Sequence, residues 1–101
     1  MSKIDALTKT LYGVENVAVI HSTHEKAPHT VAFVEVEATL PVKEKLEIAF
    51  VKTNSIADVW WRNEGVTALF GGKYCRSTMT GDMVLIGTTK YKCEHSGWSK
   101  V

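Results

Sequence analysis

The sequence lacks the features that mark membrane, secreted and strongly nucleic-acid-binding proteins. It has no apolar run approaching the roughly 18–20 residues that a membrane span requires. Residues 1–5 lack the apolar core of a signal peptide. The formal net charge is only +1, so no global field attracts phosphates or acidic lipids. We therefore expect a cytoplasmic protein with no membrane partner.

Cysteine is also scarce, because the 101 residues include only 2 cysteines. A chain of this size with 45% hydrophobic residues can bury a core without disulfides, and so few cysteines are typical of a reducing compartment. No linker, internal repeat or low-complexity segment divides the chain. The composition predicts a single domain over residues 1–101.

The clearest β signal lies near the C-terminus. An apolar run at 83–86 and an alternating segment at 91–94 flank the turn sequence Gly87-Thr88-Thr89-Lys90. Glycine can adopt the positive φ that a tight reversal needs. The pattern predicts a β-hairpin over residues 83–94.

A second antiparallel pair is predicted earlier in the chain. Residues 17–20 are rich in β-branched side chains, and residues 30–40 alternate apolar with polar positions. Between them, residues 21–29 form a polar segment with a proline and three of the four histidines. We expect this histidine loop to join the two strands.

Two helices are indicated. Pro41 suits the first position of a helix, and the apolar face of residues 41–53 comprises Val42, Leu46, Ala49, Phe50 and Thr53. This amphipathic helix is expected to cover one face of the sheet. A shorter helix is predicted at residues 2–12, where Ser2 is the cap and Gly13 the stop.

Residues 56–72 have no clean periodicity, and Gly71-Gly72 interrupts the end of this segment. We expect a long, partly ordered loop of about 15 residues, and loops of that length are often functional. The whole pattern predicts an α+β fold: an antiparallel sheet of about four strands with one or two amphipathic helices packed on it.

Motifs in residues 46–101 carry a family resemblance. A helix containing Leu46-Glu47-Ile48-Ala49-Phe50 is followed by Thr53-Asn54, a tryptophan, Arg76-Ser77-Thr78-Met79-Thr80-Gly81-Asp82, and a C-terminal Gly97-Trp98. This order resembles a group of small proteins encoded by bacteriophages and plasmids, which have no settled activity. The chain departs from that group at Met79-Thr80, where Ser-Val is usual, and this changes the apolar anchor of the turn. The resemblance implies a phage or mobile-element origin.

The turn at residues 76–82 has two interpretations. Arg76 and Ser77, with the neighbouring threonines, are residue types that bind phosphate. Alternatively, Asp82 accepts hydrogen bonds from nearby backbone N–H groups and Arg76 pairs with a carboxylate, for which Asp82 is a candidate. The spacing of a P-loop is absent. We favour the structural interpretation.

One set of residues could support either metal binding or thiol chemistry: Cys75, Cys93 and His95 with His21, His24 or His29. Thiolates and imidazoles are zinc ligands, but no C-x₂-C knuckle is present. A nucleophilic cysteine would need an activating neighbour that the sequence does not identify. We expect no metal and no cofactor, and we favour a protein that is not an enzyme.

The tryptophans are the best candidates for binding. Trp60, Trp61 and Arg62 are consecutive, and Trp98 lies near the C-terminus. Tryptophan and arginine anchor many protein interfaces, although on an extended chain one of two adjacent tryptophans is expected in the core. The predicted binding residues are Trp60, Trp61, Arg62, Arg76, Ser77, Asp82 and Trp98.

The function expected from these observations is a non-catalytic accessory protein of a phage or mobile element that binds a host or viral macromolecule in the host cell cytoplasm. A host or viral protein is the favoured partner. The alternative is a small nucleic-acid-binding module using Arg76, Lys90, Lys92 and an exposed tryptophan. A thiol or zinc-dependent enzyme is the third hypothesis. The sequence leaves homo-oligomerisation open.

The domain is predicted to fold without metal, because its apolar strands and helices supply a core by themselves, unlike a zinc finger. Adding a chelator should leave the cooperative unfolding transition unchanged in a thermal melt. Loss of that transition would instead establish the cysteine–histidine site.

Overall fold

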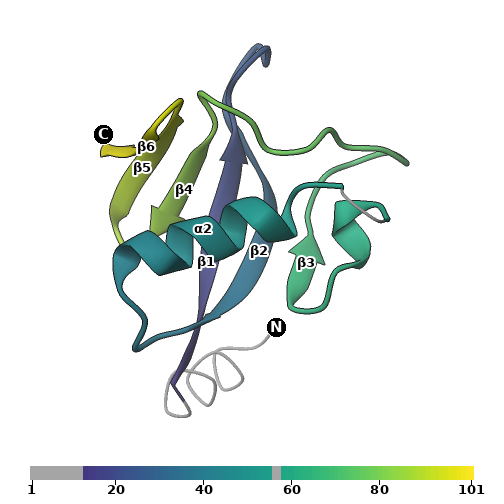
Figure 1. Ribbon diagram of the computed structural model, residues 1–101. Helices are drawn as coiled ribbons and strands as arrows, with labels where there is room; N and C mark the ends of the chain where they lie inside the picture. The colour runs from purple at the N-terminus through teal and green to yellow at the C-terminus, as the bar shows by residue number, and fades with distance from the viewer. Residues whose placement is uncertain (1–12, 56–57) are drawn as a thin grey trace.

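Six antiparallel strands form one sheet in the computed structural model, which describes residues 13–55 and 58–101 (Figure 1). The strand order across the sheet is β3-β2-β1-β4-β5-β6. The strands are β1 (Val14–His21), β2 (His29–Glu37), β3 (Val66–Ala68), β4 (Met83–Ile86), β5 (Thr89–Glu94) and β6 (Gly97–Lys100). The helix α2 (Val42–Lys52) and the short 3-10 helix η1 (Trp60–Arg62) connect β2 to β3.

The pair β1–β2 and the hairpin β4–β5 confirm two predictions. Val17 lies opposite Val34, and Val19 opposite Ala32, so β-branched and small side chains meet on one face of the sheet. The histidine loop joins these strands as expected. Strand β4 pairs with β5 on one side and with β1 on the other, which places Val84 beside Val19.

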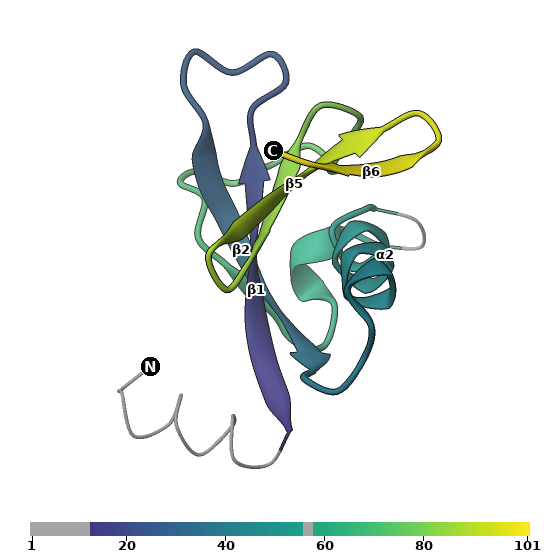
Figure 2. The same ribbon diagram turned by 90° about the vertical axis from the view of Figure 1, so that its left-hand side faces the viewer.

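Helix α2 covers one face of this sheet, as the side view shows (Figure 2). It begins at Val42, with Pro41 as the N-cap rather than the first helical residue that was predicted, and it buries Leu46 and Ala49 against the strand valines. Thr53 at its C-cap is also buried. Val42, however, is 39% exposed, so the apolar face covers less of the helix than the periodicity suggested.

The prediction of an α+β fold with about four strands is wrong. Among the described residues, 39% lie in strands and 16% in helices, and the sheet has six strands. The unexpected strands β3 and β6 have three and four residues. Segments of this length are too short to show a recognisable alternation of apolar and polar residues. They become strands because their backbones pair with a neighbouring strand. The predicted helix at 2–12 lies outside the described residues.

Residues 58–72 are more ordered than a loop. Trp60, Trp61 and Arg62 form η1, and Gly65 then adopts a φ of +81° before β3 begins. Because η1 is a tight turn, Trp60 and Trp61 do not alternate as they would on an extended chain. Trp60 is fully buried, and its indole Nε1–H donates to both Cys75 O and Arg76 O at 3.1 Å.

Replacing Trp60 by Phe is expected to lower the free energy of unfolding by about 2 kcal/mol. The change leaves a cavity and removes the donor from two carbonyl groups. Trp61→Phe is the matched control, because Trp61 is only partly buried at the edge of the core. Chemical denaturation measures both variants, and equal losses would contradict the anchoring role of Trp60.

Candidate functional site

The β1–β2 loop and the segment before β4 are held together by one ion pair. Arg76 Nη1 lies 2.6 Å from Asp82 Oδ2, and Nη2 lies 2.9 Å from Oδ1, which is a bidentate arrangement. Arg76 Nη2 also donates to Thr23 O at 2.6 Å and lies 3.3 Å from Glu25 Oε1. The guanidinium therefore joins the loop to the turn.

Asp82 is the acceptor at the centre of this arrangement. Its carboxylate is fully buried and accepts the backbone N–H groups of Ser22, Thr23 and Met79 at 2.8–3.0 Å. Burial alone would raise the pKa of Asp82, but the hydrogen bonds from Arg76 and from these backbone groups outweigh it and lower the pKa to about 2. The carboxylate is thus ionised at neutral pH.

The turn before Asp82 needs its glycine. Gly81 has a φ of +94°, and an added Cβ would collide with Thr23 Oγ1. Ser77 Oγ accepts the backbone N–H of Ser55, so this side chain also connects two segments. The ion pair between Arg76 and Asp82 confirms the prediction that Arg76 pairs with a carboxylate, for which Asp82 was a candidate.

A buried chain of hydrogen bonds runs from His21 into α2. His21 Nε2 lies 3.0 Å from Thr78 Oγ1, Thr78 donates to Thr53 Oγ1 at 2.7 Å, and Thr53 donates to Ala49 O at 2.7 Å. A carbonyl can only accept, so the proton of each threonine hydroxyl is directed away from His21. Nε2 must then carry the histidine proton, which leaves Nδ1 as an acceptor.

Cys75 faces that acceptor. Its Sγ lies 3.8 Å from His21 Nδ1, and the thiol is only partly buried. Burial raises the pKa of Cys75 and lowers the pKa of His21. The resting pair is therefore a neutral thiol beside a neutral imidazole. Cys93 differs, because it is buried and its Sγ donates to Glu94 O at 3.9 Å.

A recess of about 500 Å³ opens above these groups. Cys75 and Arg76 lie along one side of it, with Glu25 and His29 from the β1–β2 loop. Leu69, Phe70 and Tyr74 supply apolar walls. The recess thus combines apolar walls with a polar end.

An aromatic cluster extends the apolar wall onto the surface. The ring of Trp61 packs against Trp60, Phe70 and Tyr74 with centroid separations of 5.1–5.9 Å. Tyr74 is nevertheless 74% exposed and Leu69 is 45% exposed. Trp61, Leu69, Phe70 and Tyr74 are called the aromatic surface below.

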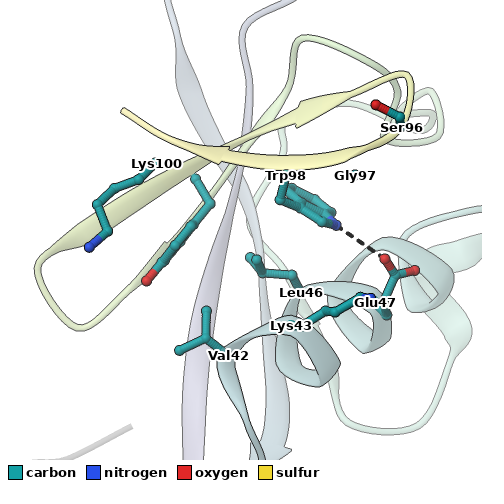
Figure 3. A pocket seen from close by; sticks show the side chains of 9 residues that line it. Val42, Lys43, Leu46, Glu47, Ser96, Gly97, Trp98 and Lys100 are labelled. Carbon is teal, nitrogen blue, oxygen red and sulfur yellow. Dashed lines mark hydrogen bonds between the residues drawn. The ribbon is translucent and has the colours of Figure 1, made fainter.

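Trp98 belongs to a separate site (Figure 3). It lies between α2 and the β5–β6 hairpin, in a groove of about 340 Å³ whose apolar lining includes Val42 and Leu46. The indole Nε1–H donates to Glu47 Oε1 at 3.4 Å, and the ring packs edge-on against Phe50. This groove is therefore distinct from the aromatic surface.

The predicted binding residues thus fall into four places. Trp60 is inside the core, Arg76 with Ser77 and Asp82 forms the polar junction, and Trp98 lines the separate groove. Trp61 belongs to the aromatic surface, and the neighbouring Arg62 is exposed, with Nη1 3.6 Å from Asp58 Oδ2. His21 was one of three histidines considered with Cys75, and the structure identifies it as the partner. The hydrogen-bonded roles of Thr53 and Thr78, and the exposed Tyr74, were not predicted.

The missed residues had no local signal. Thr78 lies 57 positions from His21 and 25 from Thr53, so only the folded chain brings them together. Within residues 13–55 and 58–101, no three His, Cys, Asp or Glu side chains are arranged to hold a metal ion.

In comparisons with known proteins, no family model, curated protein or solved structure matches the chain. No helix in the described part of the chain is long and apolar enough to cross a membrane. The function must therefore be argued from the site.

Protonation of Asp82 is predicted to destabilise the fold. Because its folded pKa of about 2 lies below the ordinary 3.8, the stabilisation is complete above about pH 4 and is lost as the pH falls towards 2. The shift corresponds to about 2 kcal/mol. Asp82→Asn should remove this acid dependence, whereas Asp58→Asn, an exposed control, should retain it. Denaturant unfolding across this pH range decides the question, and an unchanged profile in Asp82→Asn would contradict the assignment.

Arg76→Ala should lower the free energy of unfolding by about 3 kcal/mol, because it leaves the buried Asp82 carboxylate without its counter-charge. Arg62→Ala is the matched control, since its ion pair with Asp58 is exposed and should contribute under about 1 kcal/mol. Thermal melts compare the two. An Arg76→Ala protein as stable as the parent would favour the anion-binding interpretation of the turn.

Proposed function

We propose that this protein is a non-catalytic accessory protein of a bacteriophage or related mobile element, and that it binds a host or viral protein through the aromatic surface. The proposed origin rests on the resemblance of residues 46–101 to small phage and plasmid proteins. The proposed binding mode rests on the exposed side chains around the recess.

The observation that carries the binding proposal is the exposure of Tyr74 and Leu69 beside Trp61. A tyrosine that is 74% exposed and a leucine that is 45% exposed flank a ring cluster already packed on the core. Exposed apolar groups gathered in one place mark interaction sites more often than scattered ones. Aromatic rings fixed by their neighbours also lose little conformational entropy on binding.

The recess beside this surface can receive a side chain of the partner. Its walls are Leu69, Phe70 and Tyr74, and an anchor residue entering an apolar pocket is the usual centre of an interface. At its polar end, the charge of Arg76 faces both Asp82 and Glu25. The negative charge of these two carboxylates exceeds the positive charge of the guanidinium, so the recess favours an apolar or cationic side chain of the partner over an anionic one.

The same charge balance disfavours the nucleic-acid alternative at this site. Arg76 is paired inside the fold, and Arg62 lies beside Asp58, so neither offers a free charge to a phosphate. Lys90 and Lys92 lie on β5, four strands across the sheet from β3. A protein partner fits the aromatic surface better than a nucleic acid does.

The test is a pull-down from nuclease-treated host lysate, followed by titration of the captured protein. Leu69→Ser and Tyr74→Ala should each weaken its affinity by roughly tenfold or more, as expected for hot-spot residues. Both side chains are exposed, so folding should be unaffected. Val51→Ser is the matched control, because Val51 is 53% exposed on α2.

Three outcomes would contradict the proposal. One is capture that survives both substitutions. Another is capture that occurs from untreated lysate but not from nuclease-treated lysate, or an affinity that falls steeply with salt, since either result indicates phosphate contacts. The third is self-association as the only binding detected by sedimentation, with loss of the dimer in Leu69→Ser.

A further inference from the structure

We propose that Cys75 is a thiol-modification site in which His21 acts as the general base, and that its reaction partner is a small, uncharged or cationic disulfide entering the recess. This site goes beyond the binding role above and does not depend on it. Three observations carry the inference: the orientation of the His21 ring, the position of Cys75, and the shape of the recess.

The orientation of His21 follows from the buried chain of hydroxyl groups. Thr53 directs its proton to Ala49 O and Thr78 directs its proton to Thr53, so Thr78 Oγ1 accepts the proton on His21 Nε2. The unprotonated Nδ1 is then directed at Cys75 Sγ, 3.8 Å away. A base and a nucleophile at this distance can form a shorter contact once a substrate is bound.

The position of Cys75 makes it accessible. The residue is partly exposed and lines the recess, between Tyr74 and Arg76 in sequence. His21, by contrast, is fully buried, so it can exchange a proton with Cys75 but cannot contact a ligand directly. Cys75 would be the reacting residue and His21 the proton acceptor behind it.

The charged groups around the pair decide how it reacts. Asp82 Oδ2 lies 3.9 Å from His21 Nε2 and favours the protonated ring, whereas Arg76 and burial oppose it. Glu25 and His29 also face the recess from the β1–β2 loop. Because burial dominates and lowers the pKa of His21, the imidazole is neutral at pH 7 and free to accept a proton.

The reaction is a thiol–disulfide exchange. Cys75 Sγ attacks one sulfur of the disulfide while its proton moves to His21 Nδ1. A new S–S bond forms to Cys75 and the original S–S bond breaks. The leaving sulfur departs as a thiolate and takes a proton from solvent, and the proton held by His21 is later released, so that no proton is gained or lost overall. Cys75 is oxidised, the leaving half is reduced, and no further reagent is consumed.

The pH dependence of the rate distinguishes this mechanism from simple thiolate chemistry. An unassisted thiol reacts through its ionised form, so the rate rises about tenfold per pH unit below the thiol pKa. A pair that reacts from its neutral forms has a constant rate between the two pKa values. Burial moves the pKa of His21 below 6.5 and that of Cys75 above 9.0, which makes this window wide.

The experiment follows the reaction of the full chain carrying Cys93→Ser with dipyridyl disulfide, an uncharged aromatic disulfide whose released half is followed by absorbance. Intact mass confirms one addition at Cys75. From about pH 6.5 to 8.5 we expect a plateau, with less than a threefold change in rate. Thr78→Ser keeps the hydroxyl and should keep the plateau.

Thr78→Val removes the acceptor for His21 Nε2–H and should restore the tenfold rise per pH unit, as should His21→Gln. Circular dichroism checks that the variants are folded. A parent protein whose rate itself rises tenfold per pH unit would overturn the proposal, even if neither variant folds. A plateau that persists in folded Thr78→Val and His21→Gln would also overturn it, because the base would then be another group.

Discussion

The bidentate pair between Arg76 and Asp82 is the interaction on which the site depends. Burying a carboxylate is costly unless a charge and several donors surround it, and Asp82 has both. Its oxygens accept three backbone N–H groups as well as the guanidinium. The ion pair thereby fixes the β1–β2 loop against the turn that leads into β4, although the two segments lie about sixty positions apart in sequence.

This junction determines what surrounds it. With the loop fixed, Glu25 and His29 form one side of the recess, and the segment carrying Leu69, Phe70 and Tyr74 forms another. Trp60 holds the residues that follow this segment, since its indole Nε1–H donates to the carbonyl groups of Cys75 and Arg76. The aromatic surface and the reactive thiol therefore rest on a rigid base, and positions held in this way lose little entropy when a ligand binds.

Sequence reasoning succeeded where the signal was local. The Arg76–Asp82 pair spans six residues around a glycine that needs a positive φ, and α2 and the hairpin β4–β5 have clear periodicity.

Prediction from sequence failed where tertiary contacts decide the structure. Strands β3 and β6 are defined by their neighbours, and the hydrogen bonds from His21 through Thr78 to Thr53 join three distant segments. One of the two adjacent tryptophans, Trp60, lies in the core as expected, but a 3-10 turn rather than an extended chain carries the pair. Tyr74, a single aromatic residue near two glycines, has no pattern around it.

Charge balance at the junction limits the chemistry available to the recess. Arg76 would attract anions if it were free, but Asp82 and Glu25 together exceed its charge. The same two carboxylates disfavour a thiolate at Cys75, adding to the effect of burial on its pKa. A thiol that stays protonated is inert to most reagents unless a base removes its proton during the attack. The base in contact with its Sγ is His21, whose free nitrogen is set by two threonine hydroxyls. The polar junction that stabilises the fold thus also makes the reactivity of Cys75 depend on a histidine that solvent cannot reach.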